Sequence, residues 1–137
     1  PVPVEDEIKR HCPAISNCVM IGDQRKYNVA LITVKCKQDL ETGEFLEELV
    51  NEAVEVSPGV KTDSAALKDP KWQAYVEAGI KKYNGSDACA SNAQKIQKFA
   101  FLPTDLSIPG GELTGTMKVK RGFVTEKYAD IIEGLYV

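Results

Sequence analysis

The sequence predicts an α+β fold in which a small, mostly antiparallel sheet of about three strands is flanked by helices. Two kinds of pattern predict it. Short runs rich in valine, isoleucine and methionine are typical of strands, and longer segments with apolar residues every three or four positions are typical of helices. The chain has 137 residues, 43% apolar and 27% charged, as in an ordinary globular domain. We therefore expect residues 1–137 to form a single domain.

The first elements are predicted to be a helix and a hairpin. Residues Pro3–His11 carry acidic side chains at one end and basic ones at the other, which suits the helix dipole, and Pro13 ends the pattern. Asn17–Ile21 and Asn28–Lys37 have the composition of strands. The polar segment 22–26 lies between them, so we expect an antiparallel hairpin.

Helical spacing dominates the middle of the chain. Asp69 and Pro70 have the residue types of an N-cap and a first helical position. The helix that follows them is expected to end at Asn84 and Gly85. The remaining elements are predicted as helices over Phe45–Val54, Asp87–Lys98 and Val124–Leu135, a strand over Phe99–Leu102, and a loop over Ser107–Thr116.

Composition excludes several classes of protein. The net charge of −3 does not favour nucleic acid as a partner, and the mostly apolar stretch Val29–Val34 is too short to span a membrane. The four cysteines form no C-x-x-C pair, and His11 is the only histidine, so we expect no metal site. Reduced cysteines fit a cytoplasmic location. A chain that begins at Pro1 without methionine resembles a segment of a longer protein.

One cationic segment stands out. Residues 112–121 read E-L-T-G-T-M-K-V-K-R, and an extended backbone would place Lys118 and Lys120 on the same side. Such a cluster, which includes Arg121, is typical of a solvated basic surface or of an anion contact. The segment is no phosphate-binding P-loop, because Thr116 and Met117 stand where that motif needs Lys and Ser/Thr. The RNA-binding motif that Arg121 could begin fails at the following positions.

The same segment resembles the lysine motif E-L-T-P-T-x-K-L-K-R of long-chain acyl-CoA synthetases, which are adenylate-forming enzymes. Other stretches resemble the bubblegum branch of that family, and together they extend the resemblance from end to end. Gly115 and Gly122 depart from the family's usual prolines, and we expect Gly115 to loosen the loop around Lys118. The supporting stretches are residues 1–6, 16–17, 19–23, 69–70, 79–80, 92–98 and 107–113.

The resemblance implies that the chain is the mobile C-terminal lid domain of a long-chain fatty acid–CoA ligase of lipid metabolism. Lys118 would be the catalytic lysine of acyl-adenylate formation. Lys120 and Arg121 would contact the nucleotide or coenzyme A, or else hold the last helix or cover the domain interface. The lid would then rotate to permit thioester formation.

In this family, ATP, coenzyme A, Mg²⁺ and the fatty acid substrate are bound mainly by the large N-terminal AMP-binding domain. We therefore expect no cofactor in this fragment, which should be inactive alone. The full enzyme would be cytoplasmic, with peripheral attachment to the endoplasmic reticulum membrane as an option. The alternative is a non-catalytic α+β interaction module that binds a protein or a nucleic acid.

Overall fold

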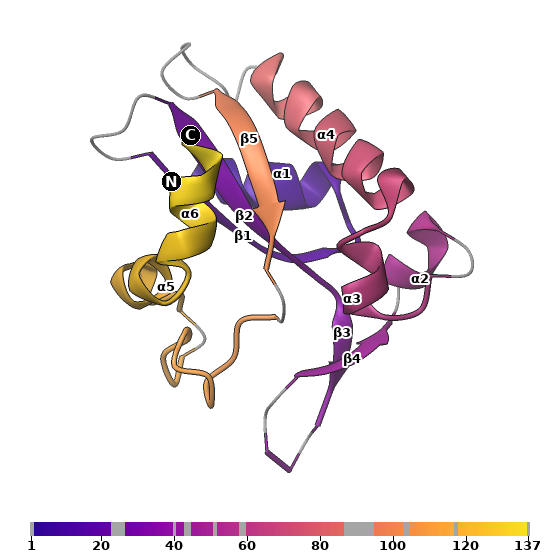
Figure 1. The fold of residues 1–137 in the computed structure, drawn as a ribbon, viewed down its shortest axis with the longest axis vertical. Coiled ribbons are helices and arrows are strands. Elements are labelled where there is room, and N and C mark those ends of the chain that lie inside the picture. Colours follow the sequence, from indigo (N-terminus) through magenta and orange to yellow (C-terminus); the bar gives the residue numbers. More distant parts are fainter. Residues whose placement is uncertain are drawn as a thin grey trace.

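A three-stranded sheet forms the centre of the computed structural model, which describes residues 2–22, 27–39, 41–42, 45–50, 52–57, 60–86, 95–102, 105–116 and 118–136. Strand β1 is Ile15–Ile21, β2 is Asn28–Val34 and β5 is Ile96–Phe101, in the order β1-β2-β5 (Figure 1). β2 pairs antiparallel with β1 and parallel with β5. The predicted α+β class and the first hairpin are confirmed, and one of the pairings is parallel.

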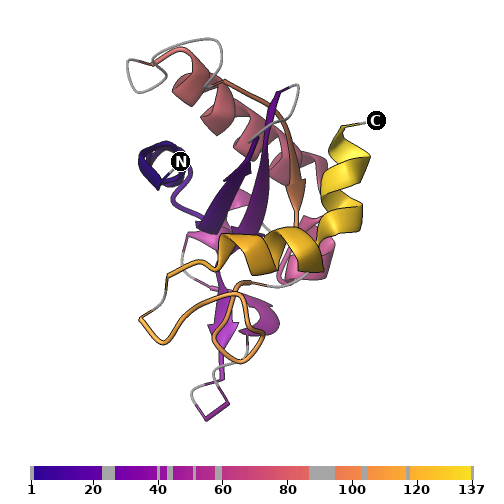
Figure 2. The same cartoon turned by 90° about the vertical axis from the view of Figure 1, so that its left-hand side faces the viewer.

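Helices cover both faces of this sheet. Helices α1 (Val2–His11) and α4 (Pro70–Asn84) lie on one face, and α5 (Arg121–Lys127) and α6 (Ala129–Leu135) lie on the other (Figures 1 and 2). Because side chains alternate along a strand, β2 supplies both layers. Its Ala30 and Ile32 belong to the core under α1 and α4, whereas Val29 and Leu31 belong to the core under α5 and α6. Every residue of β2 is buried, as expected for a central strand.

A second, two-stranded sheet corrects one prediction. Phe45–Val54 was expected to be a helix, but Phe45–Leu49 is strand β4, and only Ala53–Val56 is helical, as α2. β4 pairs antiparallel with β3 (Cys36–Gln38), and the next short helix, α3, is Asp63–Ala66. The strand predicted over Asn28–Lys37 is therefore divided between two sheets. Pairing with a partner strand outweighs the local helical spacing.

Two further predictions also need correction. The helix expected over Asp87–Lys98 is wrong at its end, because residues from Ile96 onward form β5, which also contains most of the predicted strand Phe99–Leu102. Residues 87–94 lie outside the described part. The helix expected over Val124–Leu135 is interrupted at Tyr128, where φ is −110° and ψ is 26°, so that α5 and α6 are separate helices.

The predicted ends of α4 are confirmed. The Asp69 carboxylate accepts a hydrogen bond from the Lys71 backbone N–H at 3.3 Å, and Pro70 is the first helical residue. The backbone N–H of Gly85 donates to the Lys81 carbonyl at 3.1 Å and closes the other end. This helix packs against α1, and a buried glycine, Gly79, lies next to Cys12 at the contact.

Candidate functional site

In the predicted lysine motif, residues 112–116 and 118–120 form a short hairpin, which we call the lysine hairpin. Leu113 and Val119 form an antiparallel bridge. The Lys120 backbone N–H donates to the Glu112 carbonyl at 2.7 Å, at the base of the hairpin. Nearer the tip, the Thr114 backbone N–H donates to the Lys118 carbonyl at 2.8 Å. Lys118 therefore lies on an ordered turn and belongs to no regular helix.

The side chain of Thr114 closes the tip of the lysine hairpin. Its Oγ1 accepts hydrogen bonds from the backbone N–H groups of Lys118 at 3.1 Å and Thr116 at 3.3 Å, and it lies 3.0 Å from the Thr116 hydroxyl. A Cβ at Gly115 would meet nothing within 4 Å. Gly115 was expected to loosen this loop. The backbone of Lys118 is nevertheless held by Thr114 at both its N–H and its carbonyl.

The predicted cations do not share one environment. Lys118 and Lys120 are exposed, whereas Val119 between them is half-buried against the core under α5 and α6. The predicted alternation is therefore confirmed for these two lysines. Within the described residues, no ion pair engages either ammonium group.

Arg121 turns inward instead. Its guanidinium donates to both carboxylate oxygens of Glu5, at 2.8 and 3.1 Å, and to the Met20 carbonyl at 3.0 Å. The Glu5 side chain is only 9% exposed, and its carboxylate also accepts the Met20 backbone N–H at 2.6 Å. The hydrogen bonds to Glu5, together with the charge of Glu5, raise the pKa of Arg121. Arg121 thereby joins the start of α5 to α1 and β1.

Sequence reasoning missed the buried carboxylate at the base of the lysine hairpin. Glu112 is 1% exposed. Its Oε1 accepts the Ser107 backbone N–H at 3.1 Å, and its Oε2 accepts Lys127 Nζ at 2.6 Å and the Tyr128 hydroxyl at 3.1 Å. Burial raises the pKa of Glu112, but the hydrogen bonds from Lys127, Ser107 and Tyr128 outweigh burial and hold the pKa below its ordinary value. Lys127 and Tyr128 lie 15 and 16 positions away, so no local pattern indicated them.

A glycine turn precedes the lysine hairpin and fits closely around this carboxylate. A Cβ at Gly110 would lie 2.4 Å from Glu112 Oε1. Gly111 has a φ of +89°, and its Cα faces the Phe123 ring, so that an added Cβ would lie 2.8 Å from Cζ. Both glycines are therefore required by the packing of this turn.

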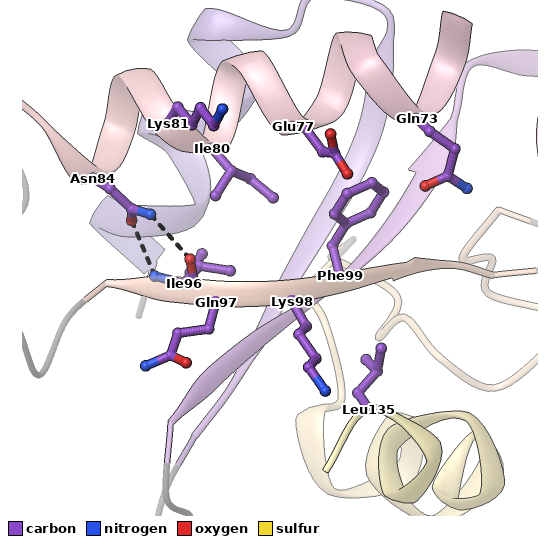
Figure 3. Close-up of a pocket in the computed structure, with 10 residues that line it drawn as sticks. All are labelled: Gln73, Glu77, Ile80, Lys81, Asn84, Ile96, Gln97, Lys98, Phe99 and Leu135. Carbon is purple, nitrogen blue, oxygen red and sulfur yellow. Dashed lines mark hydrogen bonds between the residues drawn. The ribbon is translucent and has the colours of Figure 1, made fainter. Parts of the chain in front are cut away.

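The described residues offer no ligand set for a metal ion, since no group of three or more His, Cys, Asp or Glu side chains is suitably placed among them. A hollow of about 530 Å³ lies between α4, β5 and α6 (Figure 3). Ile80, Phe99 and Leu135 line its apolar part, and Asn84 is engaged at its edge by two hydrogen bonds of 3.0 Å with the backbone of Ile96. The lysine hairpin is not part of this hollow.

None of the helices in the described part of the chain has both the length and the apolar character needed to cross a bilayer.

The sequence matches a known family over its whole length. The family model of the AMP-binding enzyme C-terminal domain matches residues 1–137, and the chain belongs to this family. A long-chain-fatty-acid–CoA ligase of Gallus gallus, ACSBG2, is 39% identical over 142 residues, covering 99% of this chain and 18% of the ligase. A second such ligase, ACSBG1 of Homo sapiens, is 39% identical over 142 residues, covering 99% of this chain and 19% of the ligase. The predicted resemblance to bubblegum-type ligases is confirmed, and the chain spans about a fifth of their length.

Solved structures with the same fold are adenylation domains. The A-PCP didomain of a carboxylic acid reductase from Segniliparus rugosus, in complex with AMP, matches with a TM-score of 0.67 and 15% identity, over 98% of this chain and 15% of that one. The adenylation domain of a Mycobacterium chelonae carboxylate reductase matches with a TM-score of 0.66 and 16% identity, over 97% of this chain and 17% of that one. At these identities the likeness establishes the fold alone.

Proposed function

We propose that this chain is the C-terminal lid domain of a long-chain fatty acid–CoA ligase and that Lys118 supplies the positive charge for acyl-adenylate formation. The observation that carries the proposal is an exposed lysine on an ordered hairpin, in a chain that matches its family over its whole length. The ligase relatives support the reaction class. The family match also argues against the alternative of a non-catalytic interaction module.

The proposed reaction explains why a lysine is needed. In the first step a fatty acid carboxylate oxygen attacks the α-phosphorus of ATP, a new P–O bond forms, and pyrophosphate leaves. In the second step the coenzyme A thiolate attacks the acyl carbon and AMP leaves. The first step brings two anions together, and a lysine ammonium is a compact charge that lowers their repulsion. By analogy with oxyanion donors, such a charge stabilises the transition state by roughly 2.7–4 kcal/mol.

The remaining parts of the site are proposed to lie outside this chain. ATP, coenzyme A, Mg²⁺ and the fatty acid would be bound mainly by an N-terminal AMP-binding domain. The described residues of this chain offer Mg²⁺ no ligand set. The isolated 137 residues would be inactive. Rotation of the lid would withdraw Lys118 before thioester formation. The expected location remains cytoplasmic, with peripheral attachment to the endoplasmic reticulum as an option.

The two neighbouring cations are proposed to differ in role. Lys120 is exposed and is the better candidate for a contact with the nucleotide or coenzyme A. Arg121 already donates to Glu5 and Met20, which supports the role of holding α5 over that of binding a cofactor.

Lys118→Ala in the intact ligase tests the proposal. Acyl-adenylate formation, measured by fatty acid-dependent exchange of pyrophosphate into ATP, should fall by at least ~10². Thioester formation from supplied acyl-adenylate should be largely retained. Lys68→Ala, at an exposed lysine outside the hairpin, is the matched control and should leave both steps unchanged. An equal loss of both half-reactions, or no loss of either, would show that the role assigned to Lys118 is wrong.

A further inference from the structure

Glu112 connects three parts of the structure around the lysine hairpin. Its carbonyl accepts the Lys120 N–H at 2.7 Å and closes the base of the hairpin. Its carboxylate accepts the Ser107 N–H, which fixes the glycine turn. The same carboxylate accepts Lys127 Nζ and the Tyr128 hydroxyl, which belong to the end of α5 and the junction with α6. Glu112 therefore fixes the base of the hairpin relative to both the glycine turn and the junction of α5 with α6.

The groups around the Glu112 carboxylate hold it in place. Lys127 also donates to the Gly110 carbonyl at 3.3 Å, so the ammonium group spans the turn and the carboxylate. A side chain at position 110 would displace Glu112. Glu112 is 1% exposed, whereas Lys127 is 38% exposed at its side chain, so a buried anion is neutralised from the solvent side. A buried carboxylate with this many donors is held in one position.

The position of Glu112 matters because Lys118 lies at the other end of the same hairpin. Between them, the hydrogen bond from the Thr114 N–H to the Lys118 carbonyl and the bridge between Leu113 and Val119 join the two arms of the hairpin. A displacement at its base is therefore passed to its tip. A shift of about 1 Å in a reacting group can reduce a rate by about 10².

We propose that Glu112 is a positioning residue for acyl-adenylate formation, which acts by fixing the base of the lysine hairpin and so the place to which Lys118 is delivered. This inference rests on the proposed function of Lys118. Glu112 itself is 1% exposed, and its carboxylate is engaged by Ser107, Lys127 and Tyr128, so we assign it no direct role in the chemistry. Its effect should therefore exist only when Lys118 is present, and only in the half-reaction that uses Lys118.

Glu112→Gln in the intact ligase is the first test. The amide keeps the size of the side chain but removes its charge, and its NH₂ group cannot accept a hydrogen bond. Either the Ser107 N–H, or Lys127 and Tyr128 together, would therefore lose their acceptor. Adenylation should fall roughly 10- to 100-fold, with thioester formation from supplied acyl-adenylate retained. Amide hydrogen exchange at Lys120, whose N–H bonds the Glu112 carbonyl, should become faster. Glu126→Gln, at an exposed carboxylate of α5, is the matched control and should change neither.

The second test is a double-mutant cycle with Lys118→Ala. In that background, Glu112→Gln should cost no further adenylation activity, because the residue that it positions is absent. The same loss with and without Lys118 would overturn the proposal, as would equal losses in both half-reactions. If Glu112→Gln does not fold, Tyr128→Phe removes one hydrogen bond, and a loss of about 2- to 5-fold in the same cycle decides the question.

The two proposals fail separately. If Lys118→Ala leaves adenylation intact, the proposed function is wrong whatever Glu112 does. If Lys118→Ala abolishes adenylation while Glu112→Gln leaves it unchanged in a folded enzyme, the proposed function stands and this inference is overturned.

Discussion

Gly79 should be the least replaceable glycine of the helices, because α1 and α4 meet at its surface. An added Cβ would lie 2.0 Å from Cys12 Sγ, far inside the contact distance of non-bonded atoms. Cys12 is fully buried, and its thiol faces the Tyr75 carbonyl at 3.8 Å, so the sulfur cannot move into solvent. Gly79→Ala therefore forces the helices apart.

The expected size of this effect follows from two opposing terms. Alanine is better than glycine in a helix by about 1 kcal/mol. Overpacking of a buried contact costs about 1–3 kcal/mol, and an overlap this severe belongs at the upper end. The net loss of stability should be about 2 kcal/mol. At roughly 2.1 cal/mol/K per residue over 137 residues, that loss corresponds to a decrease in Tm of about 7 °C.

Urea unfolding and thermal melting of the four proteins in a double-mutant cycle check this prediction. Cys12→Ala removes the sulfur, and the remaining Cys12 Cβ would lie 3.7 Å from the new methyl group, an ordinary contact. The double variant should therefore recover most of what Gly79→Ala loses, with a coupling of about 1–2 kcal/mol.

Gly134→Ala is the matched control. Gly134 lies in α6, where a Cβ would meet nothing within 4 Å, so the same change should stabilise by up to about 1 kcal/mol. The packing argument is refuted if Gly79→Ala is as stable as the parent chain, or if Cys12→Ala does not rescue it.

Three other predictions concern charge and thiol chemistry. The pKa of Glu112 is lowered in the folded state, so the ionised Glu112 stabilises the fold above the unfolded pKa of 4.5, and this stabilisation is lost as the pH falls below 4.5 toward the folded pKa. In urea titrations, the difference in the free energy of unfolding between the parent chain and Glu112→Gln should therefore shrink below pH 4.5. Arg121→Lys replaces two bonds to Glu5 by one and should lower the free energy of unfolding by about 1–2 kcal/mol, whereas an unchanged urea midpoint would refute the role of that bridge. Burial and the nearby charge of Glu5 raise the pKa of the Cys18 thiol, and Cys12 and Cys36 are buried as well. In a Cys89→Ser variant, Ellman's reagent at pH 8 should therefore react with these three thiols only after urea is added.

The sequence predicted those features that depend on neighbouring residues. Asp69 and Pro70 begin α4 because the cap and the fixed φ of proline act within one turn. The alternating exposure of Lys118, Val119 and Lys120 likewise follows from the local backbone. The family resemblance, which rests on the same kind of short motif, was also confirmed.

The errors arose where distant residues decide the outcome. Phe45–Leu49 has helical spacing but becomes a strand because β3 offers it a partner. Ile96 begins β5 because of its pairing with Asn28. The bond between Arg121 and Glu5 could not be predicted either, since nothing nearby in the chain indicates a partner 116 positions away.

The parallel pairing of β2 with β5 has a consequence for the order of folding. Val29 pairs with Ile21, 8 positions earlier, whereas Asn28 pairs with Ile96, 68 positions later. Closing the longer loop costs about 2 kcal/mol more in chain entropy. The hairpin of β1 and β2 should therefore form before β5 joins it. During synthesis, Val29 and Leu31 would then remain uncovered until α5 and α6 have left the ribosome, a period in which a nascent chain needs protection from aggregation.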